Sequence, residues 1–178
     1  MEKQLRKQEI SELVDTALDN VISEMQDVKL QTQAKSTPSG SFEKAWIPGS
    51  NVKSSGTSKQ VALEIPAGDV HSGDDWVMHT HPAGHLPIPS FQDLISAVKA
   101  KALGFKGSAI IADKEYTSIE PTDRIMHMIG PIENGDNVDR KIMSKLAGLK
   151  NNLEGMPEEV FKKLVKAGFN VDSSLLKK

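Results

Sequence analysis

The sequence predicts an α/β (α+β) fold in which a β-sheet is flanked by helices. The apolar residues have helical spacing near the N-terminus, alternate farther along, and return to helical spacing near the C-terminus. A period near 3.6 residues is typical of amphipathic helices, and a period of two is typical of half-buried strands. Stretches rich in Gly, Pro, Ser and Asp separate these segments, as turns do.

The first half of the chain is expected to form one helix followed by a run of strands. An apolar stripe predicts a helix over residues 8–25. Alternation and short apolar runs then predict strands, and a polar stretch over residues 51–58 is expected to be a loop. The strands are expected over residues 28–35, 42–47, 60–65 and 76–80.

The second half begins with a helix from Ser90 to about Leu103, followed by a hairpin and a further strand. A Gly- and Pro-containing stretch at residues 130–136 predicts a boundary between a domain over 1–130 and a C-terminal helical appendage over 131–178. The strands are expected over residues 108–112, 115–119 and 124–129, and the last helices over 138–149 and from Pro157 to about Gly168.

Composition narrows the classes of function. The chain has 178 residues and a net charge of −2, so it offers no basic surface of the kind that nucleic-acid-binding proteins use. It contains no cysteine, which excludes disulfides and thiolate zinc sites and fits a reducing compartment such as the cytoplasm. We expect no signal peptide and no membrane span, because no apolar stretch is long enough for either.

A short segment carries the clearest functional signal. His79 and His81 end an apolar run, and residues i and i+2 of a strand point to the same face of a sheet. Asp93 follows at the start of the predicted helix. Two imidazoles and a carboxylate leave one position of a tetrahedral Zn²⁺ ion open, as catalytic zinc sites do. The sequence therefore predicts a zinc site at these residues, with His85 as a solvated neighbour that could line it.

Each half of this pattern also has an ordinary structural explanation. Two histidines on one face of a strand can be plain surface residues. Ser90 and Asp93 fit a common helix start, with Ser90 as the N-cap and Asp93 near the positive end of the helix dipole. The joint occurrence of both halves, with Pro82 directly after the second histidine, favours metal binding.

The segment resembles the signature of the JAMM (MPN/JAB-domain) zinc metalloproteases, which is His-x-His-Pro, a spacer and Ser-x-x-Asp. The signature falls on His79, His81, Pro82, Ser90 and Asp93, with a spacer one residue longer than the family usually has. The likeness covers about residues 24 to 121 and indicates a prokaryotic or phage member. It implies a curved mixed sheet with a helix on each side, and hydrolysis of a peptide or isopeptide bond.

The resemblance also implies a general acid/base, a glutamate at the start of the first sheet strand. Glu24 is the candidate, because two predicted strands then separate its strand from the histidine strand, as in the family. Glu43 is the alternative, and it is also open that no carboxylate reaches the metal. Ser90 is implied to stabilise the oxyanion of the tetrahedral intermediate.

The implied partner is a protein or peptide substrate, such as the extended C-terminus of a ubiquitin-like protein. The main alternative function is a catalytically inactive JAMM-fold scaffold or partner-binding module. A hydrolase with a non-protein substrate fits the acidic charge less well. The C-terminal helical pair is expected to pack on the domain, and a surface for a homodimer or another partner is its alternative.

Overall fold

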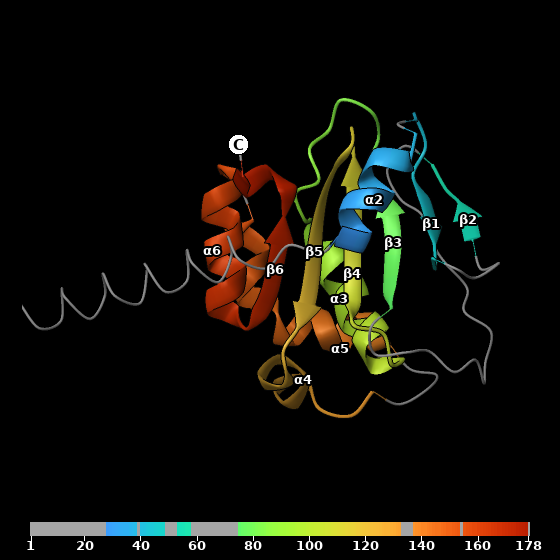
Figure 1. Ribbon diagram of the computed structural model, residues 1–178. Coiled ribbons are helices and arrows are strands. Elements are labelled where there is room, and N and C mark those ends of the chain that lie inside the picture. The colour runs from blue at the N-terminus through green and yellow to red at the C-terminus, as the bar shows by residue number, and fades with distance from the viewer. Residues whose placement is uncertain are drawn as a thin grey trace, which may run out of the picture.

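A mixed β-sheet with helices on both faces forms the centre of the protein (Figure 1). The computed structural model describes residues 28–38, 40–48, 53–57, 75–132, 137–153 and 155–177. The sheet has six strands in the order β2-β1-β3-β4-β5-β6. The predicted mixture of helices and strands around a mixed sheet is therefore confirmed.

Among the described strands, neighbours run in the same direction at one place only. They are β1 (Lys44–Trp46), β2 (Lys53–Ser55), β3 (Trp76–Thr80), β4 (Gly107–Ala112), β5 (Glu115–Pro121) and β6 (Phe169–Ser173). β3 and β4 are parallel, whereas every other neighbouring pair is antiparallel. A parallel pair needs a crossover connection, and the helix α3 (Phe91–Ala102) supplies it. This crossover places the first turn of α3 beside the end of β3.

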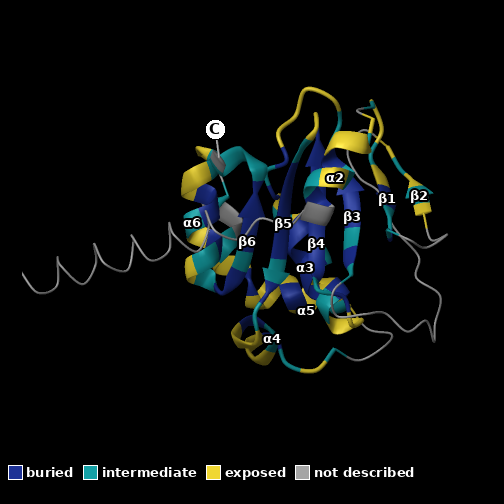
Figure 2. Cartoon of the chain, in the orientation of Figure 1, coloured by how far each residue is buried: buried dark blue, intermediate teal, exposed yellow. Residues whose placement is uncertain are grey.

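The two faces of the sheet are buried by different helices. On one face, Leu30 and Ala34 of α2 (Val28–Ser36) pack against a core that includes Met78 and Ile111. On the opposite face, α3 packs on a core that includes Ile110. Successive strand residues point to opposite faces, so β4 contributes to both cores. The central strands are accordingly buried along most of their length (Figure 2).

The C-terminal helices join the same core as α3. Ile142 and Leu146 are buried beside Phe161 and Leu164 in one apolar cluster. The predicted helical pair is confirmed, with α6 starting at Pro157 and ending before Gly168, whose φ of 118° suits glycine. The elements are α4 (Asp123–Ile129), α5 (Val138–Lys145), the 3₁₀ helix η1 (Ala147–Asn152), α6 (Pro157–Ala167) and the 3₁₀ helix η2 (Ser174–Lys177). β6 follows α6 and pairs with β5, a strand that the sequence pattern does not predict.

Two predicted strands are wrong. Residues 28–35 and 124–129 form the helices α2 and α4 instead. In α2 the buried pair is Leu30 and Ala34, and in α4 it is Ile125 and Ile129. These pairs are four residues apart, which is one turn of a helix but also fits alternation in a short window. The ambiguity of such short stretches explains both errors.

Of the other predicted elements, some are confirmed, one is wrong, and some lie outside the described residues. The strands expected near residues 42–47, 76–80, 108–112 and 115–119 and the helix opened by Ser90 are confirmed. The polar stretch 51–58 was expected to be a loop, but its middle forms the strand β2. The helix over 8–25 and the strand over 60–65 lie outside the described residues. Within the described ranges, no helix combines the length and apolar character that crossing a membrane requires.

Candidate metal centre

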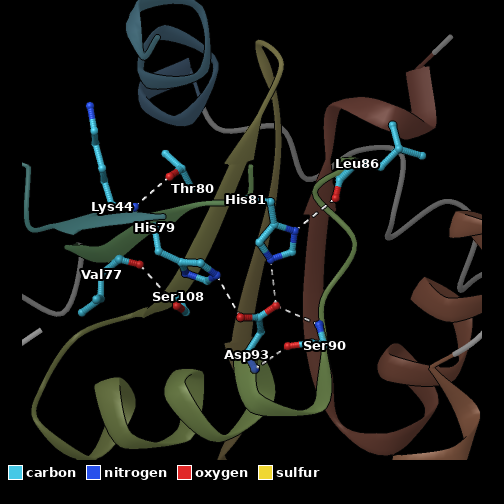
Figure 3. A network of polar contacts seen from close by, with 9 residues as sticks. All are labelled: Lys44, Val77, His79, Thr80, His81, Leu86, Ser90, Asp93 and Ser108. Atoms are coloured by element: carbon cyan, nitrogen blue, oxygen red, sulfur yellow. Dashed lines mark hydrogen bonds and ion pairs between the residues drawn. The ribbon is translucent and has the colours of Figure 1, made fainter. Parts of the chain in front are cut away.

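β3 delivers two imidazoles to one side of the sheet. His79 is paired with Ala45 of β1 on one side and with Ile110 of β4 on the other. The His81 N–H donates to the carbonyl oxygen of Ile111 at 2.9 Å, so the strand alignment continues one residue beyond β3. The two rings therefore share a face, with centroids 5.5 Å apart. That face is the one covered by α3 (Figure 3).

α3 delivers the carboxylate through its N-terminal cap. Ser90 is the N-cap, and its Oγ accepts the Asp93 N–H at 3.2 Å. In return, Oδ2 of Asp93 accepts the Ser90 N–H at 2.8 Å, which completes a capping box. The cap fixes the Asp93 side chain at the helix start, where it turns toward the two histidines (Figure 3).

The three side chains converge. Oδ1 of Asp93 lies 2.9 Å from Nε2 of His79, and Oδ2 lies 3.2 Å from Nε2 of His81. His79 and Asp93 are buried, at 7% and 8% exposure, and His81 is partly buried. Among the described residues this is the one group of His, Asp or Glu side chains whose ligand atoms lie close enough to share a metal ion, within 4.8 Å of one another.

The surroundings of one ring nitrogen indicate whether the group fits a metal ion. Nε2 of His79 is enclosed and makes no hydrogen bond of acceptable geometry to any described residue. Its short distance to Asp93, 2.9 Å, is therefore a close polar contact without a well-aligned hydrogen bond. A buried polar atom without a hydrogen bond is costly, and coordination of an ion at this position would satisfy it. The donor set of two imidazoles and a carboxylate suits zinc and similar divalent metals.

A carbonyl oxygen orients the second histidine. Nδ1 of His81 lies 3.1 Å from the carbonyl oxygen of Leu86, a residue of the loop between β3 and α3. A carbonyl accepts only, so Nδ1 carries the proton and donates it. Nε2 is then the nitrogen that faces Asp93: protonated, it donates to Oδ2, and once it loses that proton its lone pair is free to bind a metal. A carbonyl on the other ring nitrogen is the usual outer contact of a metal-binding histidine.

The charges of the group shift its pKa values. Burial raises the pKa of Asp93, but the charges of His79 and His81 and the close approach of their ring nitrogens outweigh burial and hold the pKa well below its usual range. Burial lowers the pKa of His81, but the hydrogen bond and charge of Asp93, with smaller contributions from Leu86 and Glu43, raise the pKa overall. Asp93 is thus ionised across the neutral range.

Glu43 approaches the same group from the neighbouring strand. It directly precedes β1, where its N–H donates to the carbonyl oxygen of Thr57 and its own carbonyl oxygen accepts the Gly56 N–H, both at 2.8 Å. Burial raises the pKa of its carboxyl group, the charges of His79 and His81 oppose that rise, and the charge of Asp93 adds to it. Glu43 is therefore close enough to the three converging side chains to be affected by the charge of each.

The structure brings some of the predicted site residues together and leaves others apart or undescribed. His79, His81 and Asp93 are brought together as predicted, and Ser90 caps the helix beside them. His85 is exposed in the intervening loop. Glu24 lies outside the described residues. The strand count that favoured Glu24 over Glu43 relied on a strand at residues 28–35, and that strand is a helix.

One contact near the site was not foreseen from the sequence. Thr80 lies between the two histidines and is buried at 5% exposure, and its Oγ1 accepts the Lys44 N–H at 2.9 Å. This bond ties the ligand strand to the residue that follows Glu43. No sequence pattern signals it, because the two residues are 36 positions apart and meet only through strand pairing.

No family model matches this sequence, and no curated protein and no solved structure matches it either.

Proposed function

We propose that the protein is a zinc-dependent metallopeptidase or isopeptidase of the JAMM type. The observation that carries this proposal is the convergence of His79, His81 and Asp93 in a buried group with one enclosed, unsatisfied nitrogen. Three protein ligands leave a fourth position of a tetrahedral ion for water or substrate, which is the arrangement of catalytic zinc sites. A zinc ion held there would polarise the scissile carbonyl and lower the pKa of a water molecule to about 7.

Glu43 is the residue that we propose as the general acid/base. It precedes β1, after the helix α2, and in sequence order β2 follows β1 before the chain reaches β3. With the strand predicted over residues 60–65, two strands would separate it from the histidine strand, as the JAMM resemblance requires. Glu43 would take a proton from the attacking water and pass it to the leaving amine. Its raised pKa favours this role, because proton transfer is most efficient when the pKa lies nearer the working pH.

Ser90 is proposed to act on the developing negative charge. Its Oγ accepts the Asp93 N–H, and a hydroxyl group that accepts one bond still has its own hydrogen to donate. Donation to the oxyanion of a tetrahedral intermediate is worth about 3 kcal/mol in comparable sites. The same residue would thereby fix a metal ligand through the cap and stabilise the intermediate.

The proposal is tested with the full-length chain loaded with zinc. Two probes are used: a peptide ending in Gly-Gly whose carboxyl group is joined to a lysine Nε, and the same peptide joined through an ordinary peptide bond. Cleavage is followed by mass spectrometry. We expect the wild type to cleave at least one probe, and Glu43→Gln to cleave it about 10² to 10⁴ times more slowly while keeping its zinc.

Glu158→Gln is the matched control, because Glu158 is an exposed carboxylate on α6 and should leave cleavage unchanged. A zinc-loaded wild type that cleaves neither probe would favour the inactive scaffold in place of the enzyme. Cleavage by Glu43→Gln at the wild-type rate would remove Glu43 from the proposed mechanism while leaving the zinc site intact.

A further inference from the structure

The loop between β3 and α3, residues 82–89, has two adjacent backbone N–H groups near its start that donate to other parts of the protein. The Ala83 N–H donates to the carbonyl oxygen of Gly40 at 2.8 Å. The Gly84 N–H donates to Oδ2 of Asp113 at 2.9 Å. The first bond reaches the segment that leads to Glu43, and the second reaches the tip of the β4–β5 hairpin. The second bond alone is made by a side chain.

The loop matters because one of its carbonyl groups orients a proposed metal ligand. Leu86 lies two residues beyond Gly84, and its carbonyl oxygen accepts from Nδ1 of His81. Its side chain is 51% exposed, whereas the residues that follow it are held by packing: Pro87 and Pro89 are buried, and Ile88 packs against the core. Packing therefore fixes the loop after Leu86, and the backbone bonds of Ala83 and Gly84 fix it before Leu86, so both ends decide where the Leu86 carbonyl lies.

Asp113 occupies the tip of a two-residue hairpin turn. Ala112 and Glu115 are paired across the turn, and Asp113 and Lys114 have φ values of 47° and 67°. Positive φ at both positions defines a type I′ turn, which favours Asn, Asp and Gly. Gly would satisfy the backbone requirement without a side chain. The turn alone therefore does not require a carboxylate, whereas the bond to Gly84 does require an acceptor.

We propose that Asp113 is a positioning residue for the metal centre. Its carboxylate holds the Gly84 N–H, which fixes the 82–89 loop so that the Leu86 carbonyl keeps His81 protonated on Nδ1 and its Nε2 available to the metal. This inference rests on the metal binding in the proposed function, but it does not depend on any substrate. Asp113 is exposed, so it acts through the geometry of an acceptor more than through its screened charge.

The test compares three variants of the full-length chain. Asp113→Gly removes the acceptor and keeps the positive φ without strain. Asp113→Asn keeps an acceptor oxygen and tolerates positive φ, but removes the charge. Lys114→Gly makes the same kind of change at the other turn position, which has a φ of 67° and is exposed. Each metal-free protein is titrated with zinc in competition with a chelator of known affinity.

We expect Asp113→Gly to bind zinc about tenfold more weakly than the wild type, the lower end of the range for outer contacts of metal ligands. Asp113→Asn and Lys114→Gly should stay close to the wild type. A second measurement follows hydrogen exchange of the Gly84 amide in the metal-free chain. Exchange should be faster in Asp113→Gly and unchanged in the other two variants, because only that variant loses the acceptor.

The outcomes separate this inference from the proposed function. Equal zinc affinity for Asp113→Gly and the wild type would overturn the inference, and so would equal weakening by the Gly and Asn variants. If the wild type binds no zinc, the proposed function fails. The Gly84 exchange rate then tests the bond between the Gly84 N–H and Asp113 by itself. Faster exchange in Asp113→Gly alone supports the bond, and unchanged exchange overturns it.

Discussion

The candidate metal centre has two sides that are built in different ways. On the ligand side, the capping box joins Ser90 and Asp93, which are three residues apart, and the contact to His81 spans twelve. On the Glu43 side, the nearest tie is the bond from the Lys44 N–H to Thr80, which spans 36 residues. His79 and Asp93 of the ligand side are buried, whereas Glu43 is partly exposed. Residues close in sequence thus form the group that would bind a metal ion, whereas strand pairing places Glu43, the residue proposed to transfer protons, beside that group.

The largest effect is expected when a proposed metal ligand is removed from the ligand side. His79→Ala should lower the zinc content of the purified, untagged chain from about one ion per molecule to none, because two ligands hold zinc far less tightly than three. Metal analysis of the purified protein measures this. His85→Ala is the control, since His85 is an exposed histidine of the same segment and should leave zinc bound. Equal zinc in His79→Ala and the wild type would falsify the ligand assignment.

The second prediction is that zinc affinity depends on pH through His81, which also belongs to the ligand side. The pKa of His81 is raised above 6.5 in the metal-free chain, whereas the lowered pKa of Asp93 keeps that group charged. A proton and a metal ion compete for Nε2 of His81. Zinc affinity should therefore fall as the pH drops through the pKa of His81, by about tenfold per pH unit for one displaced proton.

Competition titrations at several pH values between about 5.5 and about 8 measure this dependence. An affinity that stays constant across that range would contradict protonation of His81 as the competing event. Asp93 adds no pH dependence in this window, because its pKa lies well below it.

A smaller effect is expected where the two sides are joined. Thr80→Val removes the acceptor of the Lys44 N–H and leaves that donor without this partner in a partly buried place. The free energy of unfolding should fall by about 1 to 3 kcal/mol, and zinc should still bind because the ligands are intact. Denaturant unfolding measures the loss. Thr80→Ser keeps the hydroxyl group and should recover most of the stability; if it is as unstable as the Val variant, the lost methyl contact is the cause.

The smallest effect is expected at the helix cap of the ligand side. Ser90→Ala removes the acceptor of the Asp93 N–H and should lower the free energy of unfolding of the metal-free chain by about 1 kcal/mol. Denaturant unfolding without metal isolates this effect from catalysis. Ser90→Thr keeps a capping hydroxyl group and should lose less. A Ser90→Ala variant as stable as the wild type would mean that the cap contributes nothing measurable.

The sequence was sufficient where a structure depends on near neighbours. His79 and His81 share a face because strand side chains alternate, and Ser90 caps α3 because a hydroxyl group at that position reaches the third N–H of the helix. The sequence was insufficient for α2 and α4, since a buried pair four residues apart fits either period in a short segment. It was also insufficient for β2, a polar strand with no apolar alternation.

The sequence by itself determined the ligand set and the secondary structure that presents it. The tertiary structure alone decided which distant groups surround that set: Glu43 through the pairing of β1 with β3, and Asp113 through the β4–β5 hairpin that passes beside the 82–89 loop. The physical reason is that backbone geometry fixes where residues a few positions apart must lie. Contacts between distant residues depend on how the sheet is ordered and aligned, which no short stretch of sequence specifies.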